Sequence, residues 1–318
     1  MNARRAGFTL LELVIVLSIL SLVALLAAHS LHSAQDQHRY AAANRQLDAL
    51  RAAIWPQADP VAPSGPALPG GFVADLGRLP RAIPVTNADA STVAYTLSEL
   101  AVRPSDVPAF ALLQLSADAV CAASPAPYDP TLDADISLPT GWRGPYLAPR
   151  AAANPADFRD PWGAPLAAYP LDLYGLTNRL SADGSFADPA PFAPVAYVRH
   201  LGADLAPADT PYAVSNAFHA DRVLDLTPAT NATALLTFDV PADSAAAAVV
   251  FRLYLPCPCT GSSDADAPRA HVLSATLPAT PGTVATTAFA PVPAGWHPAA
   301  AMPEGEPELR RTFWILAR

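Results

Sequence analysis

GFTLLELVIVLSIL, residues 7 to 20, determines the structure predicted for the N-terminal part of the chain. It belongs to an apolar run that one glutamate, Glu12, interrupts. The run extends from Phe8 to about Ala28, and a helix of that length spans about 30 Å, the thickness of a bilayer core. The sequence therefore predicts an N-terminal helix over residues 8–55, with 8–28 in the membrane. A charge at the centre of such a segment costs about 2.5 to 3.5 kcal/mol, so Glu12 requires an explanation.

The residues that flank the run indicate its orientation and its alternatives. Arg4 and Arg5 are the only charges before it, and basic flanks stay in the cytoplasm. We therefore expect a cytoplasmic N-terminus, with the rest of the chain in the periplasm or in an extracellular filament. A cleaved secretory signal ending at LAAHS (residues 26–30) and a plain anchor are alternatives, but neither accounts for Glu12. In a further reading, Glu12 lies shallow enough to reach headgroups or water.

The same stretch resembles the class III signal of type IV pilins and type II secretion pseudopilins. That signal is a short basic leader ending in glycine, followed by Phe-Thr-Leu-x-Glu and an apolar helix. In that family a prepilin peptidase cuts after the glycine and methylates the new amino terminus. The resemblance implies a leader over residues 1–7, cleavage between Gly7 and Phe8, and N-methylation of Phe8. Glu12 would then pair with the amine of Phe8 on a neighbouring subunit, because an opposite charge makes a carboxylate tolerable in low dielectric.

Composition narrows the classes of function that the chain can have. The 318 residues suffice for two domains beyond the membrane helix, and the net charge is 19 − 28 = −9 with no lysine. Such an acidic chain is not expected to bind nucleic acid, which requires a basic face. For Cys121, Cys257 and Cys259, unpaired thiols are the default expectation. A disulfide from Cys121 to one of the other two, and a metal site, are the alternatives.

Residues 56–228 are expected to form a pilin-like α/β head. Tyr40, Ala43, Leu47, Leu50 and Ile54 make a one-sided stripe on the preceding helix that would pack against this head. Residues 95–120 have the spacing of a helical patch, which Pro104 and Pro108 interrupt. GFVADLGRLP (71–80), GPYL (144–147) and DPWGAP (160–165) resemble segments of the major pseudopilin of type II secretion and of related proteins.

In that family the head ends in an acidic loop that binds calcium. LGAD (201–204) and SADGSFAD (181–188) are the fragments of this type, although Leu205 stands where the family has glycine. Calcium prefers six to eight oxygen ligands. The resemblance therefore implies a calcium site, and a simply solvated loop is the alternative. The candidate ligands are Asp183, Asp188, Asp204 and Asp209.

Residues 229–318 read as an all-β sandwich domain of short strands separated by turn residues. The predicted strand segments are TALLTFDV, AVVFRLYL, HVLSATLP, TVATTAFAPV and RRTFWILA. TTAFAPVPAGWHP (286–298) resembles a strand and turn of small transthyretin-like β-domains. The expected core residues are Leu236, Phe238, Val250, Leu253, Leu255, Val272, Leu277, Phe289, Phe313 and Ile315.

The sequence contains none of the common catalytic motifs, such as a phosphate-binding glycine loop or His-Glu-x-x-His. We therefore expect an α+β protein that is not an enzyme. Its expected role is that of a minor pseudopilin-like subunit of a type II secretion pseudopilus or a type IV pilus. The expected partners are the prepilin peptidase, other pilins or pseudopilins, and the inner membrane. The alternative is a membrane-tethered periplasmic or surface binding protein that does not polymerise.

Overall fold

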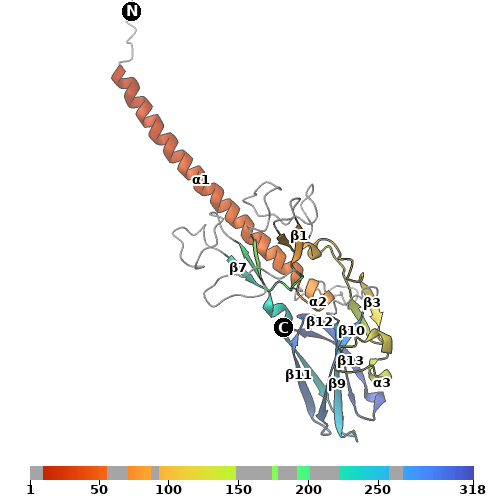
Figure 1. The fold of residues 1–318 in the computed structure, drawn as a ribbon. Helices are drawn as coiled ribbons and strands as arrows, with labels where there is room; N and C mark the ends of the chain where they lie inside the picture. Colours follow the sequence, from red (N-terminus) through yellow and green to blue (C-terminus); the bar gives the residue numbers. More distant parts are fainter. Residues whose placement is uncertain are drawn as a thin grey trace, which may run out of the picture.

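A computed structural model describes residues 10–55, 71–86, 93–147, 174–177, 192–200, 222–257 and 268–318. Helix α1 (Leu10–Ile54) is 45 residues long, and its first half projects away from all other elements (Figure 1). It ends two residues before Pro56, which cannot continue a helix without losing a hydrogen bond. The predicted long N-terminal helix is confirmed.

Short elements surround the C-terminal end of α1. Helix α2 (Phe72–Leu76) ends at Gly77, whose φ of 68° is left-handed. The strands pair as β1–β2, β3–β4 and β5–β6–β7, all antiparallel. Their bounds are β1 Ile83–Thr86, β2 Val93–Thr96, β3 Ala111–Gln114, β4 Ser137–Thr140, β5 Tyr174–Thr177, β6 Tyr197–His200 and β7 Arg222–Asp225. A one-turn helix, α3 (Pro130–Asp133), lies between β3 and β4.

The stripe on α1 packs where the sequence predicts. Leu47, Leu50 and Ile54 are fully buried in one apolar cluster together with Phe72 of α2. The helical patch expected over residues 95–120 is wrong, because this stretch forms the end of strand β2, two 3-10 turns and strand β3. Pro104 and Pro108 split it into pieces too short for a helix.

The C-terminal region consists of antiparallel strands, as predicted. Its bounds are β8 Ala232–Asp239, β9 Ala248–Pro256, β10 Ala270–Pro278, β11 Val284–Val292, β12 Gly295–Pro303 and β13 Arg311–Ala317. One sheet has the order β10-β9-β12-β13, and a second contains β11 and β8. The two sheets share an apolar core. The finer assignments, a closed β-sandwich and a pilin-like α/β head, stay predictions.

Most of the expected core residues of this region are buried or packed against its core. Val250 is the exception, because the inward-facing residue at this end of β9 is Val249. The sequence does not predict strand β12, because it contains Pro298 and a run of alanines, which are not typical of strands. The pairing of β12 with β9 begins at Ala299, so Pro298 removes no hydrogen bond from that ladder.

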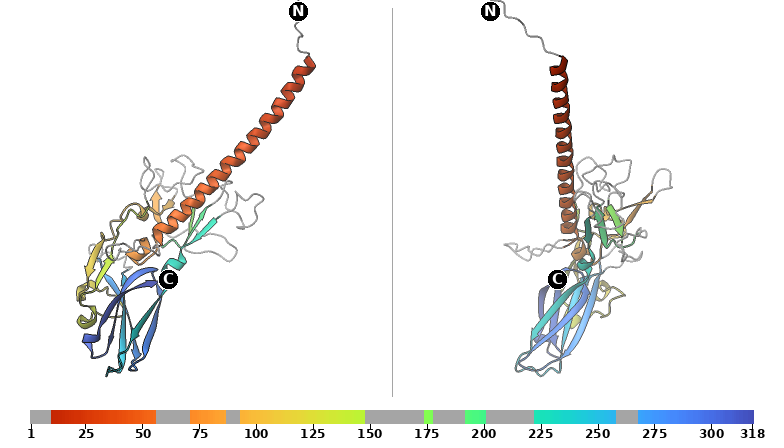
Figure 2. Two further views of the ribbon diagram at one scale, coloured as in Figure 1. Left: turned by 180° about the vertical axis from the view of Figure 1, so that it is seen from behind. Right: turned by 90° about the vertical axis from the view of Figure 1, so that its left-hand side faces the viewer.

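The outer face of the four-stranded sheet is also covered. Residues of β9 alternate between the core shared with β8 and β11 and a second cluster that contains Tyr254, Leu138 and Ile136. Segment 115–138 therefore packs on the side of the sheet opposite β8 and β11, and Figure 2 shows this arrangement from two further sides. The prediction that residues 229–318 form a domain of their own stays a prediction.

The cysteines differ from both the default expectation and the main alternative. Cys257 forms a disulfide, whereas Cys121 is a buried free thiol. The prediction of three unpaired thiols and the alternative of a disulfide at Cys121 are therefore both wrong. Cys121 lies on one side of β10 and Cys257 on the other, where their backbone N–H groups bond to Ala270 and Arg269. Two strand spacings, about 10 Å, separate them, which is too far for a disulfide.

Candidate functional site

The exposed half of α1 is the first component of the candidate site. Leu10–Ala28 is long and apolar enough to cross a membrane, and none of it is buried within the chain. It is the one helix with these properties among the residues that the structure describes. A surface this apolar is stable only in lipid or against other apolar helices.

Glu12 lies in the first turn of this helix and is exposed. It is the only charged residue of the segment Leu10–Ala28. Its position in the first turn is favourable, because the N-terminal end of a helix stabilises negative charge. Its proposed partner, the amine of Phe8, and the cleavage site at Gly7 lie outside the described residues. Cleavage, methylation and the pairing of Glu12 between subunits therefore stay predictions.

The hydroxyl groups of two serines on the same segment form hydrogen bonds within the helix. Ser18 donates to the carbonyl of Val14 and Ser21 to that of Leu17, each at 2.8 Å. Hydroxyl groups satisfied within the helix cost little in an apolar environment. Glu12 is thus the one side chain of Leu10–Ala28 whose burial in an apolar surface would require a charged partner.

The other end of α1 is fixed firmly to the rest of the chain. Beyond Leu47, Leu50 and Ile54, the indole of Trp55 packs against both large apolar clusters, the one around α2 and the one within the C-terminal sheets. The guanidinium of Arg51 lies 5.2 Å from the centre of the indole ring. The membrane segment and the C-terminal sheets are therefore connected through one buried joint. Sequence reasoning did not find Trp55, since a tryptophan before a proline carries no periodicity signal.

GPYL, one of the segments that resemble pseudopilins, lies beside a polar cluster around the buried Asp75. The Tyr146 hydroxyl donates to Asp75 at 2.9 Å, and Arg143 forms an ion pair with the same carboxylate. The Tyr146 ring makes edge contacts with Phe72 and Trp142. Burial raises the pKa of Asp75 to about 6, against the opposing effect of Arg143. This cluster joins α2 to residues 141–147, which is a structural role. DPWGAP lies outside the described residues.

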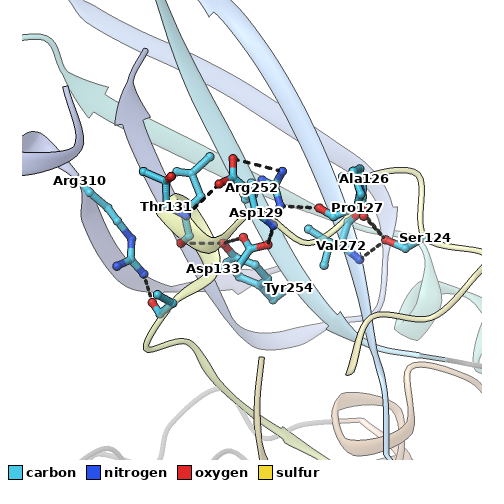
Figure 3. Close-up of polar contacts among 12 residues, drawn as sticks. Ser124, Ala126, Pro127, Asp129, Thr131, Asp133, Arg252, Tyr254, Val272 and Arg310 are labelled. Atoms are coloured by element: carbon cyan, nitrogen blue, oxygen red, sulfur yellow. Dashed lines mark hydrogen bonds and ion pairs between the residues drawn. The ribbon is translucent and has the colours of Figure 1, made fainter. Parts of the chain in front are cut away.

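A second buried polar cluster, which sequence reasoning missed, attaches segment 115–138 to the C-terminal sheet (Figure 3). The fully buried Asp133 accepts from Arg252 at 2.6 Å, from Tyr254 at 2.8 Å and from the backbone N–H of Asp129 at 2.7 Å. Arg252 also donates to the carbonyl of Pro127. Arg252 and Tyr254 are more than a hundred residues from Asp133 in sequence, so no local pattern predicts these contacts.

Thiol and imidazole groups do not assemble into reactive chemistry in the described residues. Cys121 Sγ lies 3.7 Å from His271 Nδ1, but burial raises the pKa of the thiol and lowers the pKa of the imidazole. Both groups therefore remain neutral, whereas a nucleophilic cysteine requires a thiolate. Among the described residues, no cluster of three or more His, Cys, Asp or Glu side chains could hold a metal ion. The four candidate calcium ligands, Asp183, Asp188, Asp204 and Asp209, lie outside these residues, and the calcium site stays a prediction.

Comparison with protein families matches residues 2–28 to the family described as "Prokaryotic N-terminal methylation motif". The match covers residues 2–9, which precede α1 in the sequence, and the apolar segment Leu10–Ala28. Comparisons with curated proteins and with solved structures found no match. The motif and the apolar helix together indicate a type IV pilin-like or pseudopilin-like precursor, anchored by its N-terminal span. Such a motif implies processing by a prepilin peptidase and assembly with other pilins.

Proposed function

We propose that this chain is a minor pseudopilin-like subunit of a type II secretion pseudopilus or a type IV pilus. It is held in the bacterial inner membrane by α1, with the N-terminus in the cytoplasm and the remainder in the periplasm, until it enters a filament. It works by assembly and by protein contact, and it is not an enzyme.

The observation that carries the proposal is the single carboxylate of the exposed apolar segment Leu10–Ala28, which also matches the methylation motif. A simple tether gains nothing from Glu12, because a charge inside a membrane segment only costs free energy. A filament subunit does gain, since the carboxylate pairs with the amine of Phe8 on its neighbour in a low dielectric.

The minor role is proposed from the size and place of the C-terminal sheets. They lie beyond the C-terminal end of α1, at the end of the molecule opposite the membrane segment (Figure 1). A bulky region there would crowd a tightly packed helical stack if every subunit carried it. A low copy number, with the region at a filament tip or on an outward surface, avoids this crowding.

Processing tests the first step of the proposal. The intact mass of the membrane form should correspond to a chain that begins at Phe8 and carries one methyl group on its amine. Gly7→Ala should impair cleavage, because the peptidase must approach the backbone closely at this position. A mature chain that begins at Ser30, or an uncleaved chain in cells with an active peptidase, would contradict the processing that we propose.

Substitution of Glu12 tests assembly. Glu12→Ala should insert in the membrane at least as well as the wild type, because an intramembrane charge is removed. Its share in purified filaments should fall at least tenfold, since the amine of Phe8 loses its partner. Ser18→Ala is the matched control, because it removes a polar group from the same segment without changing its charge. Equal recovery of both variants in filaments would contradict the pairing of Glu12. Absence of the wild-type chain from purified filaments would instead favour a membrane-tethered binding protein that does not polymerise.

A further inference from the structure

The outward face of β8 and β11 concentrates the exposed apolar side chains of the C-terminal region. Leu235 on β8 is 55% exposed and Val284 on β11 is 60% exposed. They are the two large hydrophobic side chains that are exposed among the described residues from 222 onward. The neighbours on this face are Thr237, Thr286 and Ala288, which are uncharged. A charged side chain follows only at Asp239, the last residue of β8.

Strand β11 also has an unprotected edge. Within the described residues it pairs with β8 alone, and its nine residues, VATTAFAPV, include no charged side chain. On the opposite side of the region the two sheets close on each other, because Thr233 and Arg318 exchange two backbone hydrogen bonds. Edge strands of monomeric proteins are usually blunted by charge, by proline or by bulges. In β11 the proline, Pro291, and the irregularity lie only beyond Phe289, so residues 284–289 carry none of these devices and can pair with another strand.

The hydrogen-bond pattern shows which residues of β11 are available at this edge. The Val240 N–H donates to the Thr283 carbonyl at 2.9 Å, so Thr283 directs its carbonyl toward β8. Backbone polar groups alternate in direction along a strand of an antiparallel pair. Val284, Thr286 and Ala288 therefore direct their N–H and carbonyl groups away from β8, toward the free edge. The same three residues place their side chains on the exposed face.

We propose that β11 pairs with β11 of a second copy of this chain, antiparallel and centred on Thr286. The pairing creates a continuous four-stranded sheet, β8-β11-β11-β8, across a two-fold axis. A symmetric contact of this kind must be complementary to itself, because the same patch is presented by both copies.

The order of residues on this face meets that requirement. With Thr286 opposite Thr286, Val284 lies opposite Ala288 of the second copy. Since Ala288 pairs with Leu235 and Val284 with Asp239 within one chain, each outer row reads Leu235, Ala288, Val284, Asp239 across the four strands. The apolar side chains thus become neighbours, and neither Asp239 faces another carboxylate. The central row contains only threonines, which are favourable cross-strand pairs.

The lack of charge on β11 and its strand geometry both permit a second copy as the occupant. Two chains of net charge −9 repel each other, and the uncharged residues of β11 offer a place where they can approach closely. The irregularity between Phe289 and Val292, together with Pro291, ends the pairing at one side. The three outward residues of each copy then form about six backbone hydrogen bonds, which fix the register.

Site-directed cross-linking of the full chain in detergent micelles tests the pairing. Thr286→Cys should form a disulfide-linked dimer under mild oxidation, because residues opposite each other at a hydrogen-bonded position have Cα atoms about 5.5 Å apart. Thr237→Cys is the matched control, since it is also an exposed threonine on the same face. In the proposed dimer the two Thr237 residues lie three strand spacings apart, about 14 Å, which excludes a disulfide. Thr286→Cys should therefore cross-link at least tenfold faster.

A second pair of variants shows whether the backbone edge is responsible. In the Thr286→Cys background, Ala288→Pro removes an outward N–H that β8 does not use, so the strand should be retained while cross-linking falls at least tenfold. Ala288→Val keeps the N–H and should leave cross-linking unchanged. If the proline variant loses its fold by circular dichroism, Val284→Lys replaces it, because it adds charge beside the edge without altering the backbone.

Several results would overturn the proposal. They are equal cross-linking of the Thr286 and Thr237 variants, cross-linking that the edge-blocking variants do not reduce, and an adduct of Thr286→Cys in cells that joins a different protein and no second copy. None of these outcomes depends on filament assembly. The β11 contact can therefore fail while the proposed assembly function stands, and the reverse also holds.

Discussion

Asp133→Asn is the substitution that most directly tests how the C-terminal sheet is held to the rest of the chain. The Asp133 carboxylate has no exposed surface and lies between Arg252, Tyr254 and the backbone N–H of Asp129. Asparagine has nearly the same shape, so the change removes charge without opening a cavity. Arg252, which is 6% exposed, then loses its close ionic partner. It keeps two neutral acceptors, the amide oxygen at position 133 and the Pro127 carbonyl, and a distant carboxylate oxygen of Asp129, 3.9 Å away.

The expected cost follows from these contacts. Breaking a buried ion pair by removing one partner costs about 3 to 5 kcal/mol, because the remaining charge stays buried without compensation. The contacts that Arg252 keeps place the expected value at the lower end, about 3 kcal/mol. For a domain of roughly 150 to 250 residues, each kcal/mol lowers the melting temperature by about 2 to 4 °C, so the melting temperature should fall by about 6 to 12 °C.

Unfolding in urea, followed by near-UV circular dichroism, measures this cost on a chain that begins at residue 29. Removing the first 28 residues should leave the fold intact, because none of Leu10–Ala28 is buried. Asp135→Asn is the matched control, since the Asp135 side chain is 94% exposed and its only ion pair in the described residues, with Arg310, spans 4.0 Å. A loss below about 1 kcal/mol for Asp133→Asn, or equal losses for both variants, would refute the reasoning.

Four further variants test other positions. The wild type should lose about 3 kcal/mol of its stability advantage over His297→Gln as pH falls from 6.5 to 4, because burial lowers the pKa of His297 to about 4 and the neutral imidazole must then be protonated. Urea titrations at several pH values measure this loss, and a constant difference would contradict it. Asp75→Asn should show the opposite trend, with the wild type gaining below pH 6, since burial raises the pKa of Asp75 to about 6. Gly77→Ala should cost at least about 2 kcal/mol, because φ is 68° and a Cβ would lie 2.5 Å from the carbonyl oxygen of Pro256. Gly305→Ala, with φ of 82° and open space around it, should cost only the backbone part, about 1 kcal/mol.

Periodicity predicts those parts of this fold whose surroundings are uniform along an element. The apolar run of α1 and its stripe at Leu47, Leu50 and Ile54 have one environment on each face. The spacing of their apolar residues is therefore sufficient to predict the helix and its buried side. The alternating pattern of β8 is likewise read correctly, since one face is buried and the other is exposed. Strand β9 is buried on both faces from Phe251 onward and its apolar sequence does not alternate, so the sequence does not show which of Val249 and Val250 faces the core.

The missed features depend on partners that are distant in sequence. The run of alanines in β12 is buried because β9 and β13 flank it, and alanine by itself favours no strand. Asp133 reads as one acidic residue among several in a turn-rich segment, and only the fold brings Arg252 and Tyr254 to it. For the candidate site the situation is reversed. Glu12 is conspicuous in the sequence, because a charge within an apolar run needs no tertiary contact to be recognised.

The joint at Trp55 determines what the membrane helix can impose on the C-terminal sheets. Trp55 contacts the cores on both sides of the joint, and the end of α2 at Gly77 closely approaches Pro256 at the end of β9. A Gly/Ser-rich linker would let the sheets rotate freely, whereas these contacts hold them in one orientation relative to α1. If α1 packs into a filament, its packing therefore also sets the direction in which β11 faces. The two contact surfaces proposed for this chain, α1 and the edge of β11, are then related by a fixed geometry, and the chain can engage both only in arrangements that this geometry allows.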